Sequence, residues 1–270
     1  MIDFLAINWT ADPEFIEIPG LGRAIRWYGI LFATAFLSGY YILDKIFINE
    51  NVGKDWLDKV LVYVMVGTIS GARFGHVFFY DWDYYSQNLG DILAIWKGGL
   101  ASHGAAIGII ISLWLFSKRV TKKPILWITD RVVITVALGS FFIRIGNLMN
   151  HEIVGKPSEL AWAFIFQYGP EPIVPRHPAQ LYEAICYLII FGIIFFLYWK
   201  KSWGKFQGKI FGLFLILVFI ARFFIEFVKN SQGGFESSFG NVLSTGQLLS
   251  IPFVLFGLYL LFRPSKTINS

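Results

Sequence analysis

The sequence predicts an all-α polytopic membrane protein with seven transmembrane helices, an outer N-terminus, a cytoplasmic C-terminus and a small outer-side arm or head region. Of its 270 residues, 56% are hydrophobic and only 15% are charged, whereas soluble domains carry about a quarter charged residues. Seven apolar segments also come close to the roughly 20 residues that a bilayer-spanning helix needs. We expect a single membrane domain over residues 1–270.

The expected spans follow from the apolar runs along the chain. They cover approximately residues 25–43, 59–79, 103–117, 130–149, 180–199, 209–229 and 245–262. The first residues lack the basic start of a signal peptide, so we expect the first span to be retained.

Two connecting segments have a character of their own. Residues 89–102 contain three glycines and are too broken to span, so we expect a re-entrant or interfacial stretch, whose backbone must be covered by protein or water. Residues 150–179 form the largest outer loop. The alternation of aromatic and other residues at 162–168 predicts a short strand or an interfacial arm there.

The orientation follows from the lysines and arginines, which favour the cytoplasmic side. The loops on one side and the C-terminal tail contain fourteen of them: Lys45, Lys54, Lys59, Lys118, Arg119, Lys122, Lys123, Arg131, Lys200, Lys201, Lys205, Lys209, Arg263 and Lys266. The other side contains six: Arg23, Arg26, Lys97, Lys156, Arg176 and Lys229. The first side is therefore assigned to the cytoplasm.

The three remaining arginines lie inside expected spans. Arg73, Arg144 and Arg222 each come late in a span that runs outward, and the first and last lie about 10 Å below the outer surface. A charge inside a membrane costs about 2.5 kcal/mol or more and usually has a functional reason. Tyr28 and His103 open spans at the same outer level. We therefore expect one outer-leaflet site for an anion, most simply a phospholipid headgroup.

Arg144 and Asn147 are spaced i, i+3, which predicts a shared helix face. Glu152 continues this polar series into the next loop, and Gly155 leaves room for close backbone approach. A guanidinium matches phosphate oxygens, and an asparagine can bind hydroxyl groups. The alternative is an interhelical polar clamp with no ligand.

Arg222 and Glu226 are spaced i, i+4 and could simply neutralise each other. That pair would still leave Arg73 and Arg144 uncompensated, so the demand for an anion remains.

His103 is the first candidate for proton transfer, because a histidine titrates near neutral pH and suits proton abstraction from a thiol. His76 and His177 are alternatives. Cys186 is the one cysteine, which excludes an internal disulfide and a thiolate-rich metal site. We expect no metal and no cofactor.

The segment from Arg144 to Gly155 resembles the signature Gly-Arg-x-Gly-Asn-Phe-x-Asn-x-Glu-x-x-Gly of bacterial prolipoprotein diacylglyceryl transferases. Other family-like segments follow in the same order: Ile25–Gly29, Gly71–Arg73, His103–Gly104, His177–Glu183, Arg222–Glu226 and Gly246–Pro252. The chain departs from the pattern at Ile143, Leu148, Ala105 and Ala106, and these exchanges of apolar or small residues affect helix packing more than chemistry.

This resemblance implies transfer of the diacylglyceryl group of phosphatidylglycerol to the lipobox cysteine of a prolipoprotein. The thioether and glycerol phosphate are the products of this first step of lipoprotein maturation. By this resemblance, Arg144 and Arg222 would bind the phosphate and stabilise it as it leaves, and Glu226 would fix Arg222. Asn147 and Glu152 would orient the glycerol, and His103 would deprotonate the thiol or orient the lipid. Tyr28, Arg73 and Gly155 would contribute to the phosphatidylglycerol site.

The implied partners are phosphatidylglycerol, prolipoprotein signal peptides with a lipobox cysteine, and membrane lipids, with no nucleic acid. The implied location is the bacterial cytoplasmic (inner) membrane, with the active site toward the outer leaflet. Two other classes remain open. An anion transporter would explain the arginines, but such folds often show repeated halves, and the sequence has none. A phospholipid-binding scaffold would leave His103 unexplained.

Overall fold

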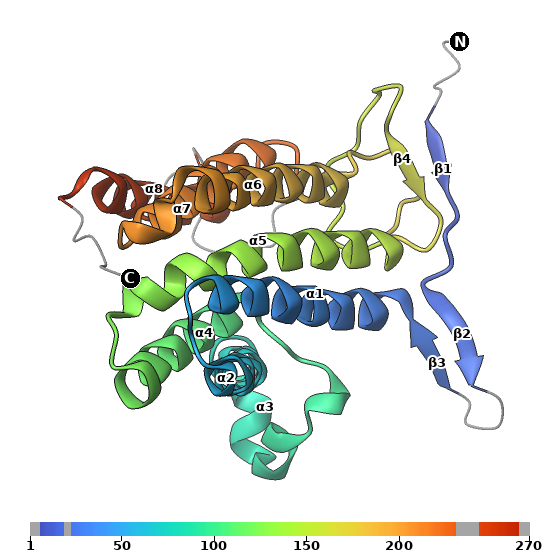
Figure 1. The fold of residues 1–270 in the computed structure, drawn as a ribbon. Coiled ribbons are helices and arrows are strands. Elements are labelled where there is room, and N and C mark those ends of the chain that lie inside the picture. Colours follow the sequence, from blue (N-terminus) through green and yellow to red (C-terminus); the bar gives the residue numbers. More distant parts are fainter. Residues whose placement is uncertain (1–5, 19–22, 231–242, 265–270) are drawn as a thin grey trace. The chain divides into compact units, whose positions relative to one another are not determined.

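The computed structural model describes residues 6–18, 23–230 and 243–264, and Figure 1 labels the elements. The long helices are α1 (Trp27–Asn49), α2 (Lys54–Phe79), α4 (Ser102–Phe116), α5 (Ile125–Met149), α6 (Ala179–Lys201), α7 (Lys209–Ile225) and α8 (Thr245–Phe262). The short helical turns are α3 (Trp82–Gln87), η1 (Leu89–Leu93), η2 (Ile95–Lys97), η3 (Ser117–Thr121) and η4 (Trp203–Lys205). The strands are β1 (Ile7–Trp9), β2 (Glu14–Ile18), β3 (Arg23–Arg26) and β4 (Phe164–Phe166).

The fold is that of a mostly helical membrane protein. Six helical segments of the described part are long and apolar enough to cross a bilayer: α1, α2, α4 continued through η3, α5, α6 and α8. The expected span at 209–229 is helical only over the 17 residues of α7, about 26 Å at 1.5 Å per residue. The seventh span therefore stays a prediction.

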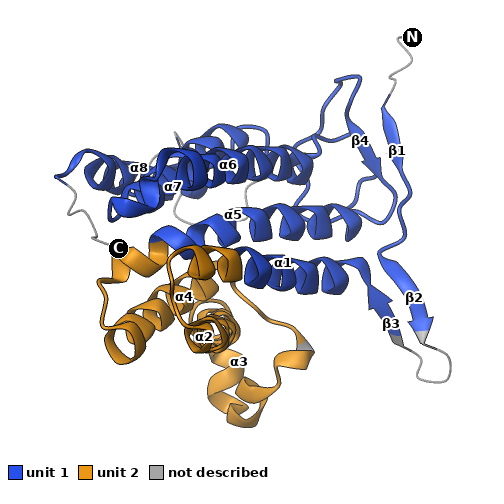
Figure 2. Cartoon of the chain, in the orientation of Figure 1, with its two compact units in different colours: residues 1–42, 130–270 blue, residues 43–129 orange. Residues whose placement is uncertain are grey.

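The chain divides into two compact units, which Figure 2 shows in different colours. Unit 1 comprises residues 1–42 and 130–270, and unit 2 comprises residues 43–129. A single membrane domain over the whole chain stays a prediction.

The start of the first helix differs from the prediction. Ile25 and Arg26 belong to strand β3, which pairs antiparallel with β2, and α1 begins only at Trp27. The Pro19-Gly20 dipeptide between the two strands is a turn signal that could have indicated this hairpin. Several helices also extend beyond the apolar runs, because hydropathy does not register polar residues in terminal helical turns. Helix α2, for example, begins at Lys54 rather than 59.

The two unusual connections have the expected broken or extended character. Residues 89–102 contain the two short 3₁₀ turns η1 and η2 and the first residue of α4, rather than a spanning helix. The alternation at 162–168 contains strand β4, which pairs in parallel with β1 from the start of the chain.

In unit 2, α2 and α4 pack backbone against backbone through small residues spaced four apart. These residues are Gly67, Gly71 and Gly75 on α2 and Gly104, Gly108 and Ser112 on α4. A Cβ atom on Gly108 would lie 2.0 Å from the carbonyl oxygen of Gly67. Small residues at every fourth position allow this close approach of membrane helices.

Gly108→Val is therefore expected to destabilise unit 2. The added side chain cannot fit without separating the helices, and such overpacking costs about 1–3 kcal/mol or more. Thermal unfolding in detergent should show a clearly lower midpoint. Gly192→Ala is the control, because nothing lies within 4 Å of a Cβ atom on this α6 glycine. A midpoint for Gly108→Val equal to that of Gly192→Ala would contradict the packing argument.

In unit 1, helix α1 packs against α5 through small residues. A Cβ atom on Gly39 would lie 3.3 Å from Thr135, and one on Gly146 would lie 2.8 Å from the ring of Tyr28. A glycine at 146 thus lets the Tyr28 ring lie directly on α5.

The loop that follows α5 is held by a small apolar core. Leu148, Val154, Phe164 and Phe166 are buried together, and Trp9 packs against them. The Trp9 Nε1–H also donates to the Leu148 carbonyl at 3.1 Å. Strands β1 and β4 therefore fix the loop that contains the polar series predicted from the sequence.

A side chain from α5 caps the N-terminus of helix α7. The carboxylate of Asp130 accepts hydrogen bonds from the backbone N–H groups of Gly208 (2.6 Å) and Phe211 (2.9 Å). A helix leaves its first N–H groups without internal partners, so this capping fixes where α7 begins. It contributes to the placement of Arg222 near the other end of the helix.

Candidate functional site

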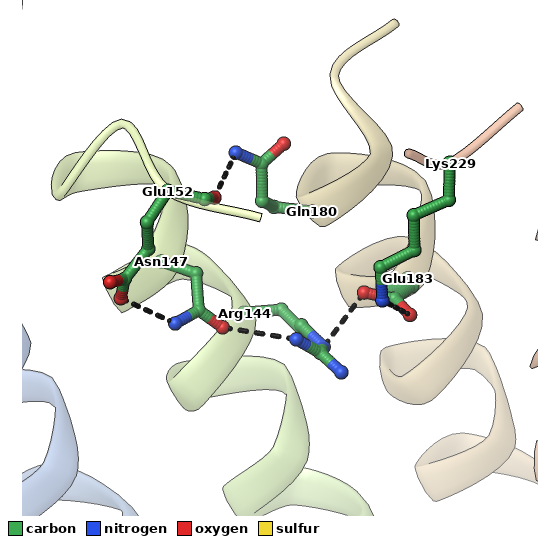
Figure 3. A network of polar contacts seen from close by, with 6 residues as sticks. All are labelled: Arg144, Asn147, Glu152, Gln180, Glu183 and Lys229. Carbon is green, nitrogen blue, oxygen red and sulfur yellow. Dashed lines mark hydrogen bonds and ion pairs between the residues drawn. The ribbon is translucent and has the colours of Figure 1, made fainter. Parts of the chain in front are cut away.

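A buried carboxylate on α6 holds two cations from different parts of unit 1 (Figure 3). The Glu183 Oε2 lies 2.8 Å from the Arg144 Nε of α5, and its Oε1 lies 3.2 Å from the Lys229 Nζ, just after α7. The Glu183 side chain is 3% exposed and the Lys229 side chain 8%, whereas Arg144 is 20% exposed. Of the three, only the guanidinium has substantial access to a ligand.

The polar series continues from Arg144 along α5 into the following loop. The Arg144 Nη1 donates to the Asn147 Oδ1 at 3.2 Å, and the Asn147 Nδ2 donates to the Glu152 Oε1 at 2.7 Å. The helix persists to Met149, so the shared face predicted from the i, i+3 spacing is confirmed. Asn147 is buried, but Glu152 is exposed and can meet a ligand.

Gln180 fixes the backbone beneath Glu152. It is fully buried on the first turn of α6, and its Nε2 donates to the Glu152 carbonyl at 2.5 Å. This bond ties the loop after α5 to the helix that supplies Glu183.

Gly155 lies at a backbone junction of three chain segments. Its N–H donates to the His177 carbonyl at 2.9 Å, and it forms an antiparallel bridge with Lys229. The N–H of Lys156 donates to the Val228 carbonyl at 2.8 Å. A Cβ atom on Gly155 would lie 2.6 Å from the Val228 oxygen and 2.7 Å from the His177 oxygen. Glycine is needed for this junction, which sets the position of Lys229.

Two tyrosines border the network. Tyr28 of α1 interacts electrostatically with Glu152 and Arg144. Tyr187 of α6 is buried, is in hydrogen-bonding contact with Arg144 and lies in the electrostatic field of Arg222. Tyr28 thus lies beside the network, and Tyr187 lies between the surroundings of Arg144 and Arg222.

Arg222 and Glu226 do not form the ion pair that their spacing allowed. Both residues are in the described part of the chain, and no ion pair or hydrogen bond joins their side chains there. Glu226 is the C-cap of α7, and its backbone N–H still donates to the Arg222 carbonyl at 3.0 Å. The Glu226 carboxylate instead lies against Gly246, where a Cβ atom would be 2.5 Å away. The Arg222 Nε is buried without a hydrogen-bond partner among the described residues.

In unit 2, Arg73 is 3% exposed and directs its donors at backbone carbonyls. They are those of Asp91 (2.5 Å), Ile92 (2.8 Å), Ala94 (3.4 Å), Gly98 (2.6 Å) and Gly99 (3.2 Å). The guanidinium also stacks over Tyr85 at 4.8 Å. This geometry favours a structural role, in which Arg73 holds the 3₁₀ segment, over direct phosphate binding.

His103 is also in unit 2, exposed in the first turn of α4. Its ring lies 5.4 Å from that of Tyr80 and 6.0 Å from that of Phe79, so the end of α2 orients it. The convergence of Arg73 and His103 with the unit 1 residues stays a prediction.

The alternative histidines differ in their surroundings. His76 stacks on Tyr80 at 5.8 Å within unit 2. His177 precedes α6, and its Nδ1 lies 3.4 Å from the Tyr182 hydroxyl oxygen. Burial lowers the pKa of the His177 imidazole from its ordinary value, which keeps the ring neutral at pH 7.

Sequence reasoning missed the roles of Gln180, Glu183 and Lys229. Within the family-like segment His177–Glu183, only His177 was given a possible role, as an alternative proton acceptor. Gln180 and Glu183 are spaced i, i+3 at the start of an apolar helix. An ionisable residue in such a helix is a functional candidate by itself, and this signal could have identified Glu183. Lys229 could not be found this way, because only the fold brings it to Glu183.

The site therefore combines a partly exposed arginine, a fixed amide and an exposed carboxylate at the ends of apolar helices. A guanidinium in such a place favours an anion, and the amide and carboxylate suit a hydroxyl-bearing headgroup. The fold and site define a helical membrane protein with a polar, partly exposed network near the helix ends.

The chain belongs to the prolipoprotein diacylglyceryl transferase family. The model of the family described as prolipoprotein diacylglyceryl transferase matches residues 13–263. Three proteins called phosphatidylglycerol–prolipoprotein diacylglyceryl transferase are similar to nearly the whole chain. The protein from Tolumonas auensis is 44% identical over 96% of this chain and 97% of its own length. Those from Porphyromonas gingivalis and Chloroherpeton thalassium are 45% and 42% identical, each over 96% of this chain and 95% of its own length.

Proposed function

We propose that this protein transfers the diacylglyceryl group of phosphatidylglycerol to the lipobox cysteine thiol of a prolipoprotein. A sulfur–carbon bond forms at the diacylglyceryl carbon, and the bond from that carbon to the phosphate oxygen breaks. Glycerol phosphate leaves, and the thiol proton passes to a base or to the leaving phosphate. The observation that carries this proposal is the chain Arg144–Asn147–Glu152, whose groups suit a phosphoglycerol headgroup, in a member of this family.

The chemistry demands charge stabilisation more than a nucleophile, because the substrate supplies the thiol. The phosphate gains negative charge as it leaves, and a preorganised cation beside it lowers the barrier. We assign this role to Arg144 and Arg222. Asn147 and Glu152 would orient the glycerol hydroxyls, and Tyr28 would line the pocket.

The other residues predicted from the sequence would act on the backbone of the site or on the thiol proton. Glu226 and Gly155 would act by shaping the backbone around the headgroup, because both lie against neighbouring main chain or glycine. Arg73 would hold the segment beside His103 rather than the phosphate. His103 keeps its proposed role as acceptor of the thiol proton.

The proposed setting is the bacterial cytoplasmic membrane. Seven spans, with α7 as the sixth, would place the N-terminus outside and the C-terminus in the cytoplasm, as the lysine and arginine distribution favours. The ends of α5 and α6 that contain the network would then face the outer leaflet. A lipobox peptide, exported with its cysteine at that level, could reach the site there.

The test is transfer by the purified protein. Phosphatidylglycerol and a lipobox peptide are incubated with it, and mass spectrometry detects the product. A mass gain of one diacylglyceryl group on the cysteine peptide, absent from a serine peptide, supports the proposal. Bound phosphatidylglycerol without transfer would instead favour a scaffold, and anion flux in liposomes would favour a transporter.

His103→Ala is expected to lower the transfer rate by about a hundredfold, the usual effect of losing a general base. Binding of phosphatidylglycerol should remain near the wild-type level, because the unit 1 network is unchanged. Rates and lipid binding are measured on the same preparations. If the variant transfers as fast as the wild type, His103 has no part in the chemistry.

A further inference from the structure

The negative charge of Glu183 lies beside the arginine that is proposed to bind the phosphate. A carboxylate that paired with Arg144 alone would cancel the charge that the phosphate needs. It would also be costly to bury, because a desolvated ion must be compensated by its neighbours. The observed arrangement avoids this conflict, since the second oxygen of Glu183 faces Lys229 at 3.2 Å. The three side chains together keep one net positive charge.

The geometry also leaves some donors of Arg144 without a partner from Glu183 or Asn147. Glu183 engages the guanidinium through Nε at 2.8 Å, and Asn147 engages it through Nη1 at 3.2 Å (Figure 3). Together with the contact to Tyr187, these contacts hold the group in place. An arginine has five N–H donors, so donors remain for a phosphate.

Lys229 is placed by main chain rather than by a helix. It lies beyond the end of α7 and bridges to Gly155, while the Lys156 Nζ donates to the Phe227 carbonyl at 2.9 Å. The ammonium is thus delivered to the carboxylate from a third chain segment. Such a placement serves charge compensation rather than helix packing.

We propose that Glu183 and Lys229 act as a positioning pair, in which Glu183 orients Arg144 toward the lipid phosphate and Lys229 restores the positive charge that Glu183 would cancel. This inference rests on the proposed function. In this role both residues act through Arg144.

Four variants separate charge from packing: Lys229→Met, Lys229→Arg, Glu183→Gln and the double variant Glu183→Gln/Lys229→Met. Taken with Arg144, the trio has a net charge of zero in Lys229→Met, two in Glu183→Gln and one in the double variant, as in the wild type. The kcat and the KM for phosphatidylglycerol are measured separately with a lipobox peptide.

Lys229→Met should raise the KM for phosphatidylglycerol about tenfold. In this variant Glu183 cancels the charge of Arg144, so the charged contact with the phosphate is weakened. Lys229→Arg keeps the charge and should stay within about threefold of the wild-type KM. Glu183→Gln should lower kcat about tenfold without raising KM, because Arg144 loses its orientation but not its charge. The double variant should regain a KM close to the wild type while kcat stays low.

The recovery of KM in the double variant is the decisive result. A merely structural role predicts a double variant at least as impaired in KM as Lys229→Met, and that outcome overturns the proposal. Equal KM values for Lys229→Met and Lys229→Arg overturn it as well, even if the Glu183 variants fail to fold.

Failure of the proposed function would look different. In that case the wild type itself shows no transfer, and the same variants are compared by the Kd for fluorescent phosphatidylglycerol in mixed micelles. A weaker Kd in Lys229→Met that is restored in the double variant still supports the pair. An unchanged Kd in Lys229→Met overturns it.

Discussion

Replacing Arg144 with alanine is expected to reduce diacylglyceryl transfer by about a thousandfold, the upper range for removing one preorganised charge donor. The guanidinium is the partly exposed cation of the network and the group that joins Asn147 to Glu183. Its loss removes the charge that would stabilise the leaving phosphate. It also leaves Glu183 with Lys229 alone, which preserves one ion pair and should allow the protein to fold.

The measurement is single-turnover transfer to a lipobox peptide, beside the unfolding midpoint of each preparation. Arg26→Ala is the matched control, because Arg26 is 62% exposed on the β2–β3 hairpin and faces Glu14 at 3.8 Å. Surface pairs of this kind contribute little. If folded Arg144→Ala retains more than about a tenth of wild-type turnover, the role of Arg144 in catalysis is wrong.

Gly155→Ala is expected to have the second largest effect, although it adds only a methyl group. That group would meet two backbone oxygens, of Val228 at 2.6 Å and of His177 at 2.7 Å, and neither can rotate away. The junction must open, and overpacking of this kind costs about 1–3 kcal/mol of stability. Lys229 would then move relative to Glu183, and a displacement of about 1 Å can cost about a hundredfold in rate.

Gly90→Ala is the control for Gly155→Ala, because no atom lies within 4 Å of a Cβ atom on Gly90. Transfer rates and unfolding midpoints are compared for the two variants. Wild-type activity in Gly155→Ala would mean that the junction tolerates expansion and does not set the site.

Local spacing could be read from the sequence, and contacts between distant segments could not. The i, i+3 relation of Arg144 and Asn147 follows from helix geometry alone, and it is confirmed. The contact between Glu183 and Lys229 joins residues 46 positions apart and depends on how α7 ends. The i, i+4 spacing of Arg222 and Glu226 likewise did not reveal that the Glu226 carboxylate lies against Gly246.

Arg73 shows a different limit of sequence reasoning. An arginine in an apolar helix demands compensation, and an anion was the expected source. In unit 2 the demand is met by carbonyl groups of residues 91–99 instead. Hydropathy marks this segment only as broken, and it does not tell where its carbonyls point. The need for partners was therefore predictable, and their identity was not.

The junction around Gly155 has a consequence for how freely this protein can change over evolutionary time. Its links between the segments after α5, before α6 and after α7 are mostly main-chain hydrogen bonds. Such bonds are indifferent to the side chain that each residue carries. Positions such as Val228 can therefore drift to other residues while the ends of three helices keep their spacing. The fixed glycine, rather than the side chains around it, is what this geometry depends on.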